Sequence, residues 1–406
     1  MAEPGCATAS APASTSVSSP ETAGEAKDDS KEILRIAIIG AGTIGLSFAA
    51  LHLAHPANRL GKRRVQVSIY DPRPDLKEYI EATLPGYLRG FSSSSKENGK
   101  QHHQVHDDEN HLTQNQPEAA PPGDVEEGLT LSHLLATGRL IIAPSLAGAV
   151  TDADIIQEQG PENIAFKQDL WPQIESLAKP SALFWSSTSG IPASVQGQRM
   201  RDPSRLLVVH PYNPPHVMPL LEIVPPAAPT PSPPQPSGSG SDAAAPSNSS
   251  SQQDLLQRTL DYWHSLNRSP VILKEEITGF VANRLAFALL REAVHLVNRG
   301  VASAEEIDRV VESSMGPRWA VKGPFWSYHA GGGKERGLRG FFDKIGDTVQ
   351  ACWDDAGAPV LKEGDGAADW VDALYKQVEK AYGRLGEKDL RARDEKTRRV
   401  LDVTMS

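Results

Sequence analysis

Three glycines, Gly40, Gly42 and Gly45, constrain the fold of this chain more than any other feature. They form the pattern GAGTIG, which directly follows the β-branched segment 33–41 and opens the amphipathic segment 45–54. A glycine turn at such a place allows close approach of the backbone to a pyrophosphate and leaves N–H groups free at the helix N-terminus. The pattern therefore predicts a dinucleotide-binding turn. A purely structural glycine turn is the alternative.

Strand-like and helix-like segments alternate through the first two thirds of the chain. Further short runs rich in β-branched residues occur at 65–71, 139–145, 153–159, 182–189, 205–210 and 270–275. Amphipathic segments with helical periodicity separate many of these runs, the last of them at 254–267. Such alternation is typical of a mostly parallel, doubly wound sheet. We therefore predict the α/β fold class, with a Rossmann-type domain over residues 31–276.

Past residue 276 the pattern becomes helical. The segment 279–300 carries a wide apolar face, so we expect a deeply packed helix that ends at Gly300. Ser303 and Glu306 have the spacing of a capping box for the next helix. These features predict an all-helical C-terminal domain over residues 277–406.

Three segments have the composition of disordered chain. Residues 1–30, about 91–127 and about 225–252 are rich in small and polar residues and nearly lack large apolar ones. Four histidines and two aspartates occur close together in the second segment. Because a flexible polar segment offers no partners that would orient metal ligands, we predict a solvated loop there and no metal site.

Composition and charge exclude several classes of partner. The formal net charge is −10, and lysine and arginine form no basic stripe, so nucleic acid and anionic membranes are not expected partners. No apolar run is long enough to span a bilayer. Two cysteines allow no disulfide framework, and the N-terminal segment lacks the features of a secretory signal or mitochondrial presequence. We expect a cytoplasmic protein.

Asp71 stands at the end of the second expected strand, where a carboxylate can accept hydrogen bonds from the adenosine ribose. A carboxylate at this position would repel a ribose phosphate, so the sequence favours NAD over NADP. Arg73 lies two residues later and leaves NADP open as the alternative.

The stretch VVHPYNPPHVMPLLEIV (208–224) combines four prolines with His210 and Glu222. Oxidising an alcohol removes a hydride from carbon and a proton from oxygen, so a base must lie at the hydroxyl. Histidine suits this role, and a carboxylate behind it fixes its tautomer. We predict that the prolines shape a loop in which His210 and Glu222 meet.

Several motifs in this order resemble the 3-hydroxyacyl-CoA dehydrogenase superfamily. They are the stretch 208–224, FWSSTSGIPAS at 184–194 and ITGFVANR at 277–284. The pattern QExxPEN at 157–163 and the run Arg318–Trp319–Ala320 before GPF resemble its lambda-crystallin/L-gulonate 3-dehydrogenase branch. The resemblance covers about 33–224 and 253–330.

The resemblance implies roles for individual residues. His210 is the expected general base and Glu222 the carboxylate that orients it, while Ser189 and Asn283 are expected at the reacting oxygen. The resemblance also implies a homodimer that pairs through the C-terminal helices. The expected NAD contacts are Gly40, Gly42, Thr43, Ile44, Gly45, Asp71, Glu162 and Lys167.

The expected substrate is a small molecule. The region after the second strand has few basic residues with which to bind the phosphates of CoA. Arg318 is the expected ligand for a free carboxylate. We predict NAD-dependent oxidation of the 3-hydroxyl of an L-gulonate-like hydroxy acid. The alternatives are a 3-hydroxyacyl-CoA or carnitine-type dehydrogenase, and a non-enzymatic NAD-binding, crystallin-like protein.

Overall fold

A computed structural model describes residues 33–54, 64–89, 91, 129–227, 248–363, 366–367 and 369–405. The expected disordered tail 1–30 and most of the two expected insertions lie outside these residues. Helix α7 (Asn248–Ser265) begins inside the range 225–252, so the prediction of disorder is wrong at its end. Serine and asparagine are favoured at helix N-termini, which accounts for a polar run opening this helix.

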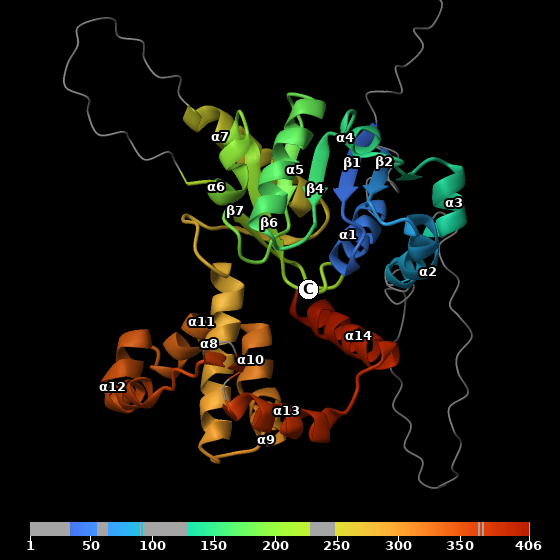
Figure 1. The fold of residues 1–406 in the computed structure, drawn as a ribbon. Helices are drawn as coiled ribbons and strands as arrows, with labels where there is room; N and C mark the ends of the chain where they lie inside the picture. Colours follow the sequence, from blue (N-terminus) through green and yellow to red (C-terminus); the bar gives the residue numbers. More distant parts are fainter. Residues whose placement is uncertain are drawn as a thin grey trace, which may run out of the picture.

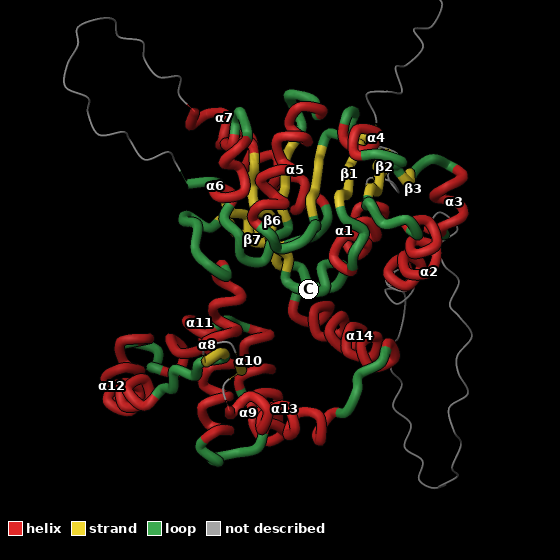
Figure 2. The backbone as a smooth tube through the Cα atoms, in the orientation of Figure 1, coloured by secondary structure: helices red, strands yellow, loops and turns green. Residues whose placement is uncertain are grey.

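An eight-stranded sheet forms the N-terminal domain, with strand order β3-β2-β1-β4-β5-β6-β7-β8. Strands β3 to β6 in this order are parallel, β7 is antiparallel to β6, and β8 is parallel to β7. The mostly parallel, doubly wound sheet is therefore confirmed (Figure 2). The strands are β1 (Ile33–Ile39), β2 (Arg64–Tyr70), β3 (Leu140–Ile142), β4 (Ile155–Glu158), β5 (Leu183–Ser186), β6 (Leu206–Pro211), β7 (Leu220–Val224) and β8 (Ser269–Ile272).

Helices cover both faces of the sheet, and each face has its own apolar core. One core joins the sheet to α1 (Thr43–Leu53), α2 (Leu76–Arg89), α3 (Leu131–Ala136) and α7, with Trp185 and Trp263 fully buried within it. The other joins it to α4 (Leu146–Val150), α5 (Ile164–Leu177) and α6 (Ala193–Gln196). The order reverses between β1 and β4, and in such folds ligands bind at the carboxyl ends of the strands at this point.

Strand β7 was not expected from the sequence. The prolines of the stretch 208–224 lie at or between the facing ends of two strands, and the apolar run Leu220–Val224 pairs with β6. His210 and Glu222 do meet, but the prediction that a loop shaped by the prolines brings them together is wrong. The two residues meet because they are directly opposite each other in an antiparallel strand pair.

The C-terminal domain is built from helices (Figure 1). They are α8 (Phe280–Asn298), α9 (Ala304–Ser313), α10 (Met315–Val321), α11 (Pro324–Gly331), α12 (Gly337–Asp355), α13 (Asp369–Tyr382) and α14 (Glu387–Thr404). A two-residue ladder of β9 (Lys362–Glu363) and β10 (Gly366–Ala367) departs from the helix-only prediction. The capping box of Ser303 and Glu306 is confirmed at the start of α9.

The prediction that helix α8 is deeply packed is wrong for most of its length. Its side chains Leu285, Phe287 and Leu290 are 63%, 58% and 55% exposed. Only Phe280, Val294 and Val297 of this helix are buried. The apolar face that the sequence shows is real, but the described residues of one chain do not cover it.

The last helix, α14, returns to the N-terminal domain beside α1 (Figure 1). Asp394 of α14 lies 3.9 Å from the Nε2 atom of His216, whose Nδ1 atom is hydrogen-bonded to the hydroxyl of Ser47 on α1 at 2.8 Å. His216 belongs to the loop between β6 and β7. This loop therefore contacts both the first and the last helix of the chain.

Candidate active site

His210 and Glu222 form a buried pair on β6 and β7, two neighbouring strands inside the sheet. The Nδ1 atom of His210 lies 2.8 Å from Oε2 of Glu222, and the two residues are 5% and 2% exposed. The ring of Phe280 packs against the imidazole with 5.0 Å between ring centroids. Because Nδ1–H donates to a carboxylate, the Nε2 lone pair is the one left to accept a proton.

The second oxygen of Glu222 binds the start of α8. Oε1 accepts hydrogen bonds from the backbone N–H groups of Val281 and Ala282 at 2.8 and 2.9 Å. Burial alone would raise the pKa of Glu222. The hydrogen bonds from His210 and from these two N–H groups outweigh it, so the pKa lies below its ordinary value. One ionised carboxylate thus orients the base and joins the helical domain to the sheet.

Glu162 holds the segment that follows β5. Its carboxylate accepts hydrogen bonds from the Thr188 hydroxyl at 2.6 Å, from the Ser189 N–H at 2.5 Å and from the Ser189 hydroxyl at 3.0 Å. Burial favours a raised pKa, but these bonds and the Lys167 charge lower the pKa of Glu162. Asn283 reaches across from α8, with its Nδ2 atom 3.5 Å from the carbonyl oxygen of Ser189. The structure therefore brings Ser189 and Asn283 together, as expected.

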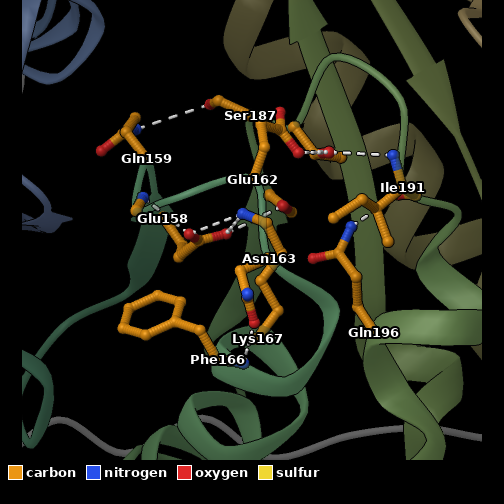
Figure 3. Close-up of polar contacts among 12 residues, drawn as sticks. Glu158, Gln159, Glu162, Asn163, Phe166, Lys167, Ser187, Ile191 and Gln196 are labelled. Carbon is orange, nitrogen blue, oxygen red and sulfur yellow. Dashed lines mark hydrogen bonds and ion pairs between the residues drawn. The ribbon is translucent and has the colours of Figure 1, made fainter. Parts of the chain in front are cut away.

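Lys167 lies in a buried ion pair. Its ammonium is 2.8 Å from both carboxylate oxygens of Glu158, and the side chains are 1% and 0% exposed (Figure 3). The Ser186 hydroxyl and the Gly160 N–H also donate to Glu158, at 2.9 and 2.7 Å. The pair fixes the loop that leads from β4 to Glu162. The direct contact of Lys167 with the cofactor stays a prediction.

The glycine turn fits a dinucleotide phosphate. Gly40 has φ of +104°, and a Cβ atom at Gly45 would lie 1.9 Å from the Gly40 carbonyl oxygen, so both positions require glycine. A Cβ at Gly42 would meet nothing within 4 Å, which indicates open space above the turn. Helix α1 begins at Thr43 and Ile44 without a side-chain cap, so its first N–H groups can bind phosphate oxygens.

Asp71 lies beside this turn at the end of β2. Its Oδ2 atom accepts the Ala41 N–H at 2.8 Å, and Oδ1 accepts the Arg73 N–H at 3.0 Å. The Arg73 guanidinium binds Asp75 at 2.9 Å and stacks on Tyr79 at 3.7 Å. The positive charge of Arg73 was the argument for NADP, and this charge is already paired with Asp75. The ribose contact of Asp71 stays a prediction.

Arg318 lies on α10 and is exposed. In the described part of the chain, no hydrogen bond or ion pair joins its side chain to His210, Ser189 or Asn283. The structure therefore assembles the expected base, carboxylate and oxygen-binding residues, but it does not bring the expected carboxylate ligand into contact with them.

Sequence reasoning missed two residues of the site, Glu158 and Thr188. Thr188 lies two residues after β5, at the carboxyl end of a parallel strand, a position that could have identified it. Among the described residues, no group of three metal-binding side chains occurs, and no helix is long and apolar enough to cross a membrane.

The known proteins that this chain is similar to include dehydrogenases of one family. The family model for the 3-hydroxyacyl-CoA dehydrogenase NAD-binding domain matches residues 35–232, and that for the C-terminal domain matches residues 279–370. A 3-hydroxyacyl-CoA dehydrogenase from Gibberella moniliformis is 31% identical over 87% of this chain and 89% of its own length. An L-carnitine dehydrogenase from Streptomyces coelicolor is 30% identical over 88% of this chain and 98% of its own length.

A solved structure shows the same similarity. It is an NAD⁺-dependent dismutase named 5-formyl-3-hydroxy-2-methylpyridine 4-carboxylic acid 5-dehydrogenase, with a TM-score of 0.58 and 25% identity. The alignment covers 91% of this chain and 97% of that one.

Proposed function

Because the chain belongs to the 3-hydroxyacyl-CoA dehydrogenase family, and is thus an NAD-dependent oxidoreductase acting on CH–OH groups, we propose that it oxidises a small free 3-hydroxy acid. The single observation that supports oxidation of a hydroxyl is the buried His210–Glu222 pair, whose carboxylate also binds the first turn of the helix that carries Asn283. The resemblance to the 3-hydroxyacyl-CoA dehydrogenase superfamily is confirmed, and the resemblance to its lambda-crystallin/L-gulonate 3-dehydrogenase branch stays a prediction. The non-enzymatic alternative loses its basis, since the family is one of dehydrogenases.

The proposed mechanism uses the chain's own side chains at the hydroxyl. NAD, which the glycine turn and the first N–H groups of α1 would hold, would supply the acceptor for the hydride of the carbinol carbon. His210 takes the hydroxyl proton at Nε2 while Nδ1–H remains bonded to Glu222, whose negative charge stabilises the imidazolium. Ser189 and Asn283, which in the structure donate to Glu162 and to the Ser189 carbonyl, are proposed to turn their hydrogens to the oxygen that becomes the carbonyl oxygen.

The substrate class is the finer part of the proposal. Two of the three similar proteins are named for small free molecules, carnitine and a pyridine carboxylic acid derivative. Helix α2 supports the same class, because Lys77 and Arg89 are its only bases and Lys77 lies 3.9 Å from Glu81. L-gulonate is the candidate from sequence, and carnitine is the candidate favoured by the relative's name. A 3-hydroxyacyl-CoA is the second candidate, favoured by the Gibberella moniliformis relative.

A substrate panel tests this proposal. NADH formation should be measured with L-gulonate, carnitine, 3-hydroxybutyrate and a 3-hydroxyacyl-CoA, each with NAD and with NADP. We expect turnover with at least one free acid and NAD, at a kcat/KM well above that for the CoA ester. A higher kcat/KM for the CoA ester would overturn the free-acid proposal and leave the family assignment intact.

Arg318 is proposed as the ligand for the carboxylate of the bound substrate. Replacing Arg318 with Met should raise KM for the free acid by roughly tenfold or more and leave kcat within a few-fold, because a charge-assisted bond to the ground state is lost. Arg309→Met is the matched control, since Arg309 is another exposed arginine of the helical domain and pairs with Glu305 in its own helix. Equal KM values for the Arg318 variant and the wild type would contradict the assignment.

We also propose a cytoplasmic homodimer that pairs through the helical domain. Exposed apolar side chains of α8 support this arrangement, with Leu285 and Leu289 on one stripe and Phe287 and Leu290 farther around the helix, because large exposed apolar areas are typical of interfaces between subunits.

A further inference from the structure

A chain of buried hydrogen bonds runs through the core and ends at the crevice. The Tyr262 hydroxyl lies 2.6 Å from Nδ1 of His52, and Nε2 of His52 lies 2.9 Å from Oε1 of Gln157. The Nε2 atom of Gln157 donates to the hydroxyl of Ser187 at 3.1 Å. His52 and Gln157 are 0% exposed, whereas Ser187 is half-buried. The chain thus connects the interior of α1 and α7 with the first residue after β5.

The bonds of this chain have one common direction. The amide nitrogen of Gln157 donates to Ser187, so its carbonyl oxygen must accept from His52 Nε2–H. His52 is then the neutral tautomer that accepts at Nδ1 from the Tyr262 hydroxyl. Burial raises the pKa of Tyr262, which keeps its hydrogen in place. The Tyr262 hydroxyl can thus donate to Nδ1 of His52, in the direction that the Gln157 amide gives to the bonds that end at Ser187.

In this direction Ser187 accepts a hydrogen bond from Gln157, so the hydrogen of its own hydroxyl is not donated to Gln157. The Ser187 oxygen accepts from Gln157 and, at 3.5 Å, from Nε2 of Gln159, and the second contact is drawn in Figure 3. Among the described residues, the Ser187 hydroxyl donates no hydrogen bond, and the nearby amide of Gln159 has a buried Oε1 atom without a partner. A molecule bound at the carboxyl end of β5 can accept the Ser187 hydrogen.

The position of Ser187 indicates which molecule this is. Ser187 binds Gln157 on the α1 side of the sheet, and the glycine turn opens on that side because it leads into α1. His210, in contrast, contacts Glu222 and Phe280 on the opposite side. Ser187 is therefore closer to the expected path of the dinucleotide than to that of the hydroxy acid.

We propose that Ser187 is a further cofactor-contact residue that donates a hydrogen bond to bound NAD, and that Tyr262, His52 and Gln157 are positioning residues that keep its hydroxyl in the donating state. The proposal rests on the NAD dependence of the family and not on the proposed substrate class. It is therefore tested through NADH binding, with no substrate present.

The experiment combines two conservative variants with a matched control. Ser187→Ala removes the donor, and Tyr262→Phe removes only the hydroxyl at the far end of the chain. The control is Thr259→Val, which removes a buried hydroxyl of the same helix that bonds to Trp185 at 3.1 Å and lies outside the chain. NADH dissociation constants are measured by fluorescence titration for all three variants and for Ser187→Ala/Tyr262→Phe.

We expect Ser187→Ala to weaken NADH binding about tenfold and Tyr262→Phe about threefold, with Thr259→Val unchanged. The double variant should bind as Ser187→Ala does, because Tyr262 acts through Ser187. Unchanged binding in Ser187→Ala, additive losses in the double variant, or equal effects of Tyr262→Phe and Thr259→Val would each overturn the proposal.

A second measurement addresses the direction of the chain in the unaltered protein. Nitrogen-15 chemical shifts of labelled histidine distinguish the two neutral tautomers, and the His52 signal is identified by its change in Tyr262→Phe. The Nε2–H tautomer is expected at neutral pH. An Nδ1–H tautomer or a charged imidazolium would contradict the proposed direction.

Discussion

Two buried carboxylates at the crevice have different partners and therefore different consequences. Glu222 accepts hydrogen bonds from the imidazole of His210 and from two N–H groups of a helix. The other ring nitrogen of His210, Nε2, remains able to accept a proton. Glu158 binds the ammonium of Lys167 at 2.8 Å with both oxygens. The first pair orients a base, and the second fixes the loop that carries Glu162.

At the residue scale, the ion pair gives a stability prediction. Lys167→Met should lower the free energy of unfolding by roughly 3–5 kcal/mol, because it leaves a buried carboxylate without its counter-charge. Glu158→Gln/Lys167→Met removes both charges and should recover most of that loss. Urea unfolding of the three proteins measures this. Equal destabilisation of the single and the double variant would contradict the account.

The sequence revealed the residues of the site better than their contacts. His210, Glu222, Ser189 and Asn283 were expected together; the structure joins His210 to Glu222 and Asn283 to the Ser189 carbonyl, and their meeting at one substrate stays a prediction. The partner of Lys167 was not predictable, because Glu158 lies on the preceding strand and no helical or strand spacing relates the two. The Tyr262–His52–Gln157 chain joins segments that are 210 and 105 residues apart, so only the fold brings them into contact.

At the scale of elements, the loop between β6 and β7 is enclosed by helices from both ends of the chain. His216 in this loop bonds to Ser47 of α1, packs edge-on against Tyr87 of α2 and lies near Asp394 of α14. Burial, with a smaller effect of Arg398, lowers the pKa of His216 to about 4. The neutral imidazole is therefore the form that the fold requires.

This lowered pKa predicts an acid-sensitive contact. The unfolded chain binds a proton at this histidine near pH 6.5, whereas the folded chain does so only near pH 4. The neutral His216 thus contributes fully to the free energy of unfolding above about pH 6.5. This contribution, at most about 3 kcal/mol, is lost as the pH falls towards 4. His216→Asn should flatten the decline in unfolding free energy between pH 7 and pH 5. The exposed His133→Asn is the control, and parallel wild-type and His216→Asn curves would refute the idea.

Elements with clear periodicity were predictable, and those that depend on pairing were not. The glycine turn, the parallel strands and the capping box at Ser303 follow from local pattern. Strand β7 escaped prediction because the prolines before it indicate a loop, while its pairing with β6 is a tertiary contact. Helix α8 was expected to be packed, because an apolar face in the sequence does not reveal what covers it.

At the scale of the whole molecule, many apolar side chains of the helical domain stay exposed among the described residues of one chain. Among the exposed apolar side chains are Leu285, Phe287 and Leu290 of α8 and Phe325 and Trp326 of α11. Burying such a face contributes about 25 cal/mol per Å² of apolar area. A second copy of the chain is the proposed cover.

The proposed dimer predicts a defined mass in solution. Sedimentation velocity should give twice the chain mass of 43.8 kDa for the wild type. Leu285→Asp/Leu290→Asp should sediment as a monomer, whereas Leu385→Asp, an exposed site between α13 and α14, should remain dimeric. A monomeric wild type would rule the dimer out.

The central claim is that His210, held by Glu222, takes the hydroxyl proton as NAD is reduced. The most direct test is a single-turnover measurement of NADH formation with wild type and His210→Asn, using the best substrate of the panel, together with NADH binding. We predict a rate about a thousandfold lower in the variant and an NADH dissociation constant within twofold of the wild type. A variant that keeps its rate, or one that loses NADH binding along with it, would contradict the claim.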